Sequence, residues 1–507
     1  MRPSDDIPAQ VVQLQVLLGA ALERIRELEQ DREAQVVQLQ VLLGAALEKV
    51  RELEQENAQL RARLRQNSTN TSRPPSSDPA GTTRAKKKKK RRRRHPGGQV
   101  GHPKHERELV PLEKVQRVRE LVPERCSKCQ KKLKGRDGEP QRHQVVELKP
   151  VRAVVTEYRS HQLECAACGS LTRAPIPRHA RSAFGERLGA SMSLLVGKYR
   201  LSKRLVCEVL SDMGGVHLSV GSVSNLEQQM SAALKAPVEQ AREHVREAEV
   251  VNADETGWAQ GVKAGRAARA WLWVVATAWV VVFQIATSRG SQVIKALLGK
   301  DFIGWLITDR WSAYDWYDAG LRQLCWAHLT RDFQGFIDRG GQGGRLGRRL
   351  MAERNRMFKW WHRVKEGTLE RSKFQRRMRK VEQRVGQLLR QAQACGEKKT
   401  AGMARHILRL EKCLWVFVDV PGVEPTNNYG ERTIRQGVIY RKISFGTRSE
   451  RGSRFIERIL TVVTTLKQQK RNPLEFLTEA LGAYRRGLPP PSLLPASESA
   501  QAASIAA

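Results

Sequence analysis

The 507-residue chain is short of acidic residues, of cysteine and of long apolar runs. Only 52 Asp and Glu stand against 90 Lys and Arg, so the formal net charge of +38 predicts a polyanionic partner, nucleic acid before a membrane surface. No apolar run approaches the roughly 18–20 residues of a spanning helix, and the first six residues lack the layout of a secretory signal. We therefore expect a cytosolic protein, whose eight cysteines are metal ligands or core residues before disulfides.

An internal repeat marks the N-terminal region, where Ala9–Gln30 recurs almost unchanged as Ala34–Gln55. Apolar residues alternate by three and four along both copies, which is the pattern of a leucine zipper. They are Leu14, Leu18, Ala21, Ile25, Leu28, Leu39, Leu43, Ala46, Val50, Leu53, Leu60 and Leu64. The period of 25 residues (34 minus 9) is three heptads plus four, so we expect a stutter near Arg32 and Gln35. The pattern predicts a homo-oligomeric coiled coil, with one helix packed on its own chain as the alternative.

Ser, Thr and Pro dominate from Asn67, and nine successive cations follow. Such a segment cannot fold alone, and its charges suit phosphate contacts that carry no sequence information. The predicted DNA-binding cations are Lys86, Lys87, Lys88, Lys89, Lys90, Arg91, Arg92, Arg93 and Arg94. A merely solvated charge run is the alternative.

Two Cys-x-x-Cys pairs come next, formed by Cys126, Cys129, Cys165 and Cys168. Each spacing lets two thiolates face one ion, so the four cysteines predict one structural zinc ion. Between the pairs, 144–148 and 154–158 have strand-like patterns, as a zinc ribbon needs.

A helical region follows from about Phe184. A helix over Leu201–Met213, the pair Gly214-Gly215 and a second helix from near Ser222 have the spacing of a helix-turn-helix. The second helix is not basic, so simple helical packing is an equal alternative.

Beyond Arg242 the pattern is mixed. It predicts strands at 249–253, 270–276 and 279–285, a helix at 292–298 and a strand at 302–307. This order matches an RNase H-like core whose first and fourth strands are neighbours. The stretch Arg345–Trp415 is helical and basic, so we expect an α-helical insertion within this core.

Three acidic residues occupy settings typical of a DDE nuclease. Asp254 and Asp309 end short apolar runs, and Glu431 lies on a predicted helix opened by Asn427 and Asn428. Carboxylates gathered in this way can hold two magnesium ions about 3.5–4 Å apart, with manganese as a substitute, for phosphodiester cleavage. For each acid, the alternative is a carboxylate that only caps a turn.

Neighbouring residues are expected to support this site. Glu255 should face the opposite side of its strand, and Glu424 should lie outside the helix. The pair Cys325 and His328 is expected to brace the start of the insertion, with metal ligation as the alternative. The cations expected to hold phosphates after the third acid are Arg432, Arg435, Arg441 and Lys442.

The order of these motifs resembles a transposase of the insertion sequence 66 family over nearly the whole chain. The resemblance rests on five features in this order: the zipper, the basic run with Pro96–His102, the paired cysteines, the sequences around the three acidic residues, and Arg441–Gly452. Arg310 after the second aspartate, and Tyr429-Gly430 before the third acid, depart from the small residues usual there.

The resemblance implies a bacterial, nucleoid-associated enzyme. It should bind the terminal inverted repeats of its own element, cut the 3′ ends with water and join them to double-stranded target DNA, beside accessory proteins of that element. A DNA-binding regulator built from the zipper and a zinc ribbon, with an inactive nuclease-like core, is the competing interpretation.

The expected fold class is a multidomain α+β or α/β protein. It combines a coiled coil, a zinc-ribbon-like module, a helical DNA-binding region and an RNase H-like core with a helical insertion. The expected boundaries are 1–66 for the coiled coil, 67–95 for the basic linker, 96–183 for the zinc module, 184–244 for the helical region, 245–333 and 420–472 for the two parts of the core, 334–419 for the insertion, and 473–507 for a C-terminal helix and tail.

Overall fold

The computed structural model describes residues 7–64, 108–135, 137–148, 152–263 and 266–495. These residues belong to two units, 1–87 and 88–507, which we describe separately. The Lys86–Arg94 run and the Pro96–His102 motif lie outside the described residues. None of the described helices is both long enough and apolar enough to cross a membrane.

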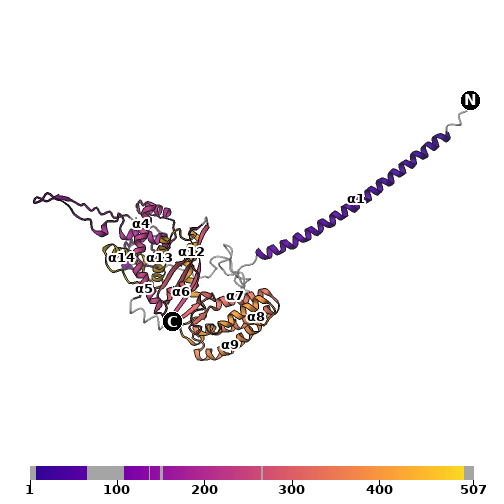
Figure 1. The fold of residues 1–507 in the computed structure, drawn as a ribbon. Helices are drawn as coiled ribbons and strands as arrows, with labels where there is room; N and C mark the ends of the chain where they lie inside the picture. Colours follow the sequence, from indigo (N-terminus) through magenta and orange to yellow (C-terminus); the bar gives the residue numbers. More distant parts are fainter. Residues whose placement is uncertain (1–6, 65–107, 136, 149–151, 264–265, 496–507) are drawn as a thin grey trace. The chain divides into compact units, whose positions relative to one another are not determined.

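The described part of the first unit is a single helix, α1 (Ile7–Leu64), of 58 residues (Figure 1, indigo). Both copies of the internal repeat lie on it, and the predicted stutter does not interrupt it. The apolar seam is exposed: Leu14 is 65% exposed, Leu43 60% and Leu53 52%. The described residues of this unit therefore offer the seam no surface of their own chain to pack on.

The cysteine-rich region contains little regular structure. Strand β1 (Gln162–Glu164) pairs antiparallel with β2 (Leu171–Arg173), and η2 (Leu112–Lys114) and η3 (Arg178–Ala180) are short 3-10 turns. The prediction of strands at 144–148 and 154–158 is wrong. Those residues make no ladder, and Val145 and Val154 are 82% and 94% exposed. A strand needs a pairing partner. In the described part of this region, a ladder forms around the second cysteine pair, and Arg125 and Lys132 make a single antiparallel bridge beside the first pair.

A five-stranded mixed sheet has the spatial order β5-β4-β3-β6-β7. Its strands are β3 (Val250–Lys263), β4 (Arg266–Ala276), β5 (Val281–Ala286), β6 (Trp305–Thr308) and β7 (Arg322–Leu324). The first three pair antiparallel, and β6 pairs parallel with both β3 and β7. Helix α6 (Ser291–Leu298) connects β5 to β6. The expected adjacency of the first and fourth strands is confirmed.

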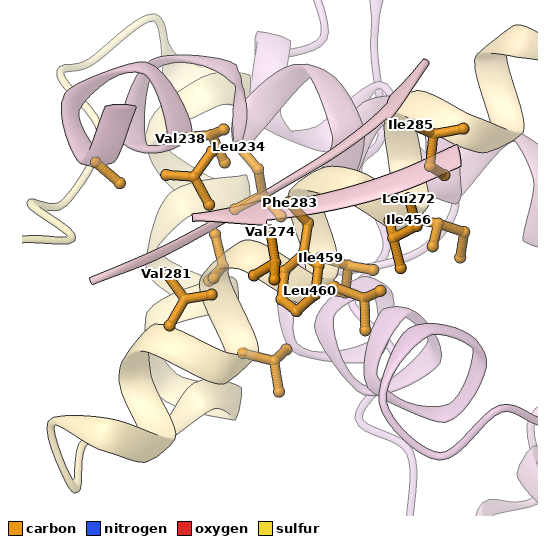
Figure 2. Close-up of a cluster of buried hydrophobic side chains, with 14 of the residues drawn as sticks. Leu234, Val238, Leu272, Val274, Val281, Phe283, Ile285, Ile456, Ile459 and Leu460 are labelled. Carbon is orange, nitrogen blue, oxygen red and sulfur yellow. The ribbon is translucent and has the colours of Figure 1, made fainter. Parts of the chain in front are cut away.

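Apolar side chains join this sheet to the helices on one face. They alternate along β4 and β5 and recur at helical spacing on α13 (Glu450–Gln468) and α5 (Lys235–Arg246). Figure 2 shows Phe283 and Val274 from the sheet beside Ile459 and Leu460 from α13, with Val238 from α5 in the same cluster. Burying side chains of this size contributes about 1.5–3 kcal/mol each.

The edge strand β5 is sealed by side chains of α13. The backbone N–H groups of Val281 and Phe283 donate to the hydroxyls of Thr465 and Thr461, at 3.0 and 2.9 Å, and the N–H of Ile285 donates to the carboxylate of Glu457. The three acceptors recur every four residues, so one row of the helix runs along the strand. This removes the unpaired edge that would otherwise invite association.

The helices before the sheet pack into the same core. They are α2 (Glu186–Gly197), α3 (Lys203–Gly214), α4 (Val220–Ala233) and α5, and α14 (Pro473–Arg486) packs against α2 and α4. The helix-turn-helix spacing is present: α3 ends at Gly215 in a left-handed conformation and α4 begins after Ser219. Helix α4 nevertheless buries Val223, Leu226 and Met230, which favours the packing interpretation.

The predicted helical insertion has a second hydrophobic core. It comprises α7 (Trp326–Arg339), α8 (Gly341–Lys365), α9 (Arg371–Gln393), α10 (Lys398–Arg409), η5 (Glu411–Leu414) and α11 (Val416–Asp419), the first three grouped in Figure 1. Ile307 of β6 and Leu324 of β7 belong to this core, so the insertion is anchored on the sheet. The chain then returns to the sheet as α12 (Asn428–Ser444).

Candidate active site

The two aspartates lie side by side because of strand register. In the parallel pairing of β3 with β6, Asn252 is opposite Ile307. Asp254 and Asp309 each lie two residues further along, so they reach the same level on neighbouring strands. Ligand sites of α/β sheets form at this end of parallel strands.

Helix α12 brings the third acid to the same place. Its first residue is Asn428, as predicted, and Glu431 lies in its first turn. Asn427 is fully buried, and its side chain donates to the carbonyl of Ala253 at 2.7 Å instead of capping the helix. The residue before the helix is therefore fastened to the residue before Asp254. Further along, a Cβ on Gly437 would lie 2.0 Å from a terminal methyl of the buried Leu272, so any larger residue would have to displace that side chain.

The carboxylates repel one another. The pKa of Asp254 is raised well above its usual value, first by burial and then by the charges of Glu255, Asp309 and Glu431. Asp309 and Glu431 are therefore within electrostatic reach of Asp254, although the oxygens of the three acids do not all lie within 4.8 Å of one another. A divalent cation would relieve such repulsion, so the residues present fit a metal site.

Asp309 is held by its own loop. Its Oδ1 accepts the backbone N–H of Trp311 at 2.8 Å, and its backbone carbonyl accepts Nη2 of Arg322 at 3.0 Å. Arg322 is buried and also pairs with Asp315 at 2.9 Å. Asp315, a neighbouring acid of the same loop, is thus used to hold a buried arginine.

Glu255 faces the other side of β3, as predicted. It is buried there, where Arg289 reaches its Oε1 at 2.8 Å and the hydroxyl of Tyr314 donates to its Oε2 at 2.6 Å. Burial, above all, raises its pKa. The sequence pattern alone does not predict this buried pairing, because an arginine 34 residues away supplies it.

Cys325 and His328 both approach Glu431. Cys325 follows β7, and its sulfur accepts the backbone N–H of Asn427 at 3.1 Å. Nδ1 of His328 lies 3.3 Å from Oε1 of Glu431. The described residues contain one group of three metal-type ligands within 4.8 Å of one another, and it is this one. Burial raises the pKa of the Cys325 thiol to about 12, and burial together with Arg331 lowers the pKa of His328 to about 4.

In the absence of a metal ion, these pKa values leave both side chains neutral at neutral pH. The imidazole nitrogen nearest the carboxylate is Nδ1, which lies at ion-pair distance but makes no hydrogen bond. The thiol keeps its proton at neutral pH. The pair lies between the starts of α7 and α12, where it can brace them or, together with Glu431, hold a metal ion.

The fold accommodates Arg310 and Gly430, two of the residues that depart from the residue types expected beside the acids. Arg310 pairs with Asp332 of α7 at 3.0 Å and contacts His406 of α10. It thereby ties the loop after β6 to the insertion. A Cβ on Gly430 would meet the amide of Asn427 at 2.6 Å, so glycine there leaves room for that amide.

Two further glutamates that could compete for the third acidic position have other partners. Glu424 pairs with Lys365 at 2.7 Å, outside the helix as expected. Glu457 seals strand β5 and pairs with Arg454 at 2.8 Å.

The predicted phosphate-binding cations differ in exposure. Arg432, Arg435 and Lys442 are exposed on α12. Arg441 is half-buried instead, with its guanidinium donating to the hydroxyl of Thr256 at 3.2 Å and to the carbonyl of Gly257. Arg441 therefore joins α12 to the strand that carries Asp254.

The four predicted zinc ligands form two separate knuckles. In the first, the N–H of Cys126 donates to Lys131, and in the second the N–H of Cys165 donates to Ser170, both at 2.9 Å. The pKa of Cys126 is lowered first by the backbone N–H groups of Cys129 and Lys128, and that of Cys168 first by the hydroxyl and the backbone of Ser170. The other cysteine of each pair adds a smaller lowering. Among the described residues, the sulfurs of the four cysteines do not all lie within 4.8 Å of one another.

The mixed sheet, its helical insertion and the coupled carboxylates define an α/β protein with an acidic site where the parallel pairing of β3 with β6 stops. The model of the IS66 family of transposases matches residues 181–455, which include the sheet, the insertion and all three acids. The match covers more than half of the chain, and the chain belongs to this family. The family expected from the sequence is thereby confirmed.

Two other similarities cover different parts. Residues 22–108 match a family of unknown function, DUF6444. An uncharacterized protein of Sinorhizobium fredii, y4qI, is 26% identical over 75% of this chain and 74% of its own length.

Proposed function

We propose that this transposase is a DDE enzyme with an RNase H-like core. It binds the terminal inverted repeats of its insertion sequence, cuts the DNA and transfers the cut strand to target DNA. The observation that carries the proposal is the meeting of Asp254, Asp309 and Glu431, which are coupled although 177 residues (431 minus 254) separate the first from the last. The strand order, with three antiparallel strands followed by two parallel ones, supports the core assignment.

The chain's own groups divide the work of cleavage. Asp254 and Asp309 provide oxygen ligands from neighbouring strands, and Glu431 completes the set from α12. His328 and Asn427 hold α12 and its carboxylate in register with β3. Two magnesium ions held there, or manganese in their place, would activate the attacking oxygen and stabilise the leaving one.

DNA is held by cations that do not take part in the chemistry. Arg432, Arg435 and Lys442 lie exposed on the helix that carries Glu431, where phosphates of a bound strand would pass. The Lys86–Arg94 run adds contacts that set the salt dependence of binding.

The N-terminal helix makes the enzyme a dimer or a larger homo-oligomer. Its exposed seam, which spans about 13 helical turns from Leu14 to Leu60, needs a partner helix, and a second copy offers the same seam. The two cysteine knuckles together hold one structural zinc ion, because each already presents two sulfurs on one turn. We place the working enzyme in the bacterial cytoplasm at the nucleoid, beside accessory proteins of its element.

The test is strand transfer of a labelled repeat end into plasmid DNA, with magnesium or manganese. Asp254→Asn, Asp309→Asn and Glu431→Gln each remove one charge with little change of shape. We expect product to disappear while repeat-end binding stays. Glu424→Gln, an amide change in an exposed ion pair, is the matched control and should keep activity.

Outcomes of this test separate the two candidate functions. Near-normal product from any single variant removes that residue from the site. Repeat-end binding by the wild type without any cleavage, under either metal, would instead favour the regulator with an inactive core.

A further inference from the structure

One aromatic side chain projects from the turn between α12 and α13. Phe445 is 82% exposed and has a φ of +60°, in the left-handed region that bulky residues avoid. Ile443, two residues earlier, is 55% exposed. Strained, exposed positions of this kind persist only when the surrounding structure imposes them.

The turn is fastened to the far end of β3. The N–H of Thr447 donates to Ala259 at 2.9 Å, the N–H of Gly261 donates back to Thr447 at 2.8 Å, and the indole of Trp258 donates to the Thr447 hydroxyl at 3.1 Å. Gly446 has a φ of +102°, and a Cβ there would lie 2.2 Å from the carbonyl of Ala259. The exposure of Phe445 is therefore a property of a rigid turn.

The surroundings of this aromatic side chain are cationic. Between residues 441 and 454 five cations accompany a single acid, Glu450. Of these cations Lys442, Arg448 and Arg451 are exposed. An apolar ring among cations matches a partner with flat apolar faces and a polyanionic backbone, which describes nucleic acid.

The same helix leads from the acidic site to this ring. Glu431, Arg435 and Lys442 follow one another at intervals of four and seven residues, so they share one face of α12. Fourteen residues separate Glu431 from Phe445 (445 minus 431), which is about 21 Å of helix. At about 3.4 Å per nucleotide along a duplex, this corresponds to about six nucleotides.

We propose that Phe445 stacks on a nucleobase of the bound DNA end, about six nucleotides from the phosphate held at the acidic site. The ring distorts the duplex there, while Lys442 and Arg448 hold the adjoining phosphates. This inference rests on the proposed function and adds a base-contacting residue to it.

The experiment measures DNA binding, so it does not depend on cleavage. The probes are duplexes that end at the terminal repeat found beside the gene, each with one base replaced by the fluorescent analogue 2-aminopurine, moved stepwise inward from the end. Duplexes of unrelated sequence serve in parallel, because stacking is sequence-tolerant. Variants are Phe445→Gly, which suits the left-handed backbone, and Phe445→Trp, which keeps a ring. Tyr484→Ala removes a half-exposed ring from α14 as the control.

We expect wild type and Phe445→Trp to change the fluorescence at one position near the sixth base. Phe445→Gly should abolish that signal, weaken binding at least about fivefold and leave the salt dependence of binding unchanged. Its Tm should equal or exceed that of wild type, because glycine relieves the left-handed strain. Tyr484→Ala should behave as wild type.

An unchanged signal in Phe445→Gly would overturn the proposal, as would an equal loss of binding in Tyr484→Ala. A signal spread evenly over all positions would overturn the stated distance. Failure of the proposed function looks different, since the stacking signal would then be normal while strand transfer is absent from wild type.

Discussion

The side-chain amide of Asn427 donates to the backbone carbonyl of Ala253 at 2.7 Å, across 174 residues of sequence. This bond joins the start of α12 to the strand that carries Asp254. A second bond ties the same helix start to the residue after β7, since the backbone N–H of Asn427 donates to the sulfur of Cys325. The geometry of the acidic site depends on this junction, which no one segment of the chain can form alone.

Replacing Asn427 by alanine should disturb both fold and chemistry. The buried carbonyl of Ala253 loses its partner, which costs about 1–3 kcal/mol in the free energy of unfolding. Strand-transfer activity should fall by more than the loss of folded protein explains, because Glu431 is no longer held beside Asp254. Urea unfolding and strand transfer measure the two effects. The exposed neighbour Asn428, changed to alanine, is the control, and equal effects of the two changes would refute the junction.

Asp254→Asn should stabilise the metal-free protein at neutral pH. The raised pKa means that the folded chain binds a proton more tightly than the unfolded chain does. The stability of the metal-free wild type therefore falls as the pH rises from the unfolded value of about 3.9 through the raised value. The amide removes this cost, and each kcal/mol relieved raises Tm by roughly 2–4 °C.

With magnesium, wild type should become the more stable of the two proteins, because magnesium stabilises wild type and binds the Asp254→Asn variant less tightly. Thermal unfolding with and without magnesium, from acid to neutral pH, measures both effects. Asp212→Asn, an exposed aspartate of α3, is the control. A lower Tm of metal-free Asp254→Asn would contradict the predicted repulsion.

His328→Ala should act on the chemistry through Glu431. Partners of this kind typically contribute about 10–100-fold to metal affinity or activity. We expect strand transfer to need more magnesium, and His328→Asn to restore part of the activity through its amide donor. The exposed His362 of α8, changed to alanine, is the control. Elemental analysis should show the same metal content as wild type, and a lost metal ion would make His328 a ligand instead of a brace.

Purified, reduced protein should contain about one zinc ion per chain, held by the two knuckles. Serine in place of any of the four cysteines should remove it and weaken repeat-end binding, while circular dichroism of the mixed sheet and its helices stays unchanged. Serine in place of Cys207, a half-buried cysteine of α3, is the control. Protein free of zinc would refute the site.

Deleting the first 66 residues should weaken self-association and the pairing of two DNA ends. Nicking of a single end should change less, since the acidic site lies in the other unit. Sedimentation velocity measures the association. An unchanged oligomer after deletion would show that the seam of α1 is not the interface.

Local pattern alone predicts much of this protein. The zipper spacing predicts α1, apolar runs predict β4, β5 and β6, and the two asparagines predict where α12 begins. Of β3 only the first part is predicted, because the strand continues to Lys263. These elements depend on periodicity and on neighbours a few residues away, which the sequence contains directly. The sequences around the three acidic residues and the order of the motifs were also enough to predict the family.

The tertiary structure decided which partners the side chains meet. Strand β7 escapes prediction because two of its three buried residues, Arg322 and Gln323, are polar and find partners only in the fold. Asn427 looks like a helix cap and instead bonds to a distant strand. The bond of Arg441 to β3 likewise has no signal in the local sequence. Hydrogen bonds between segments distant in sequence depend on register and on the approach of helix to sheet. These come from the packing of the whole core, so no local pattern contains them.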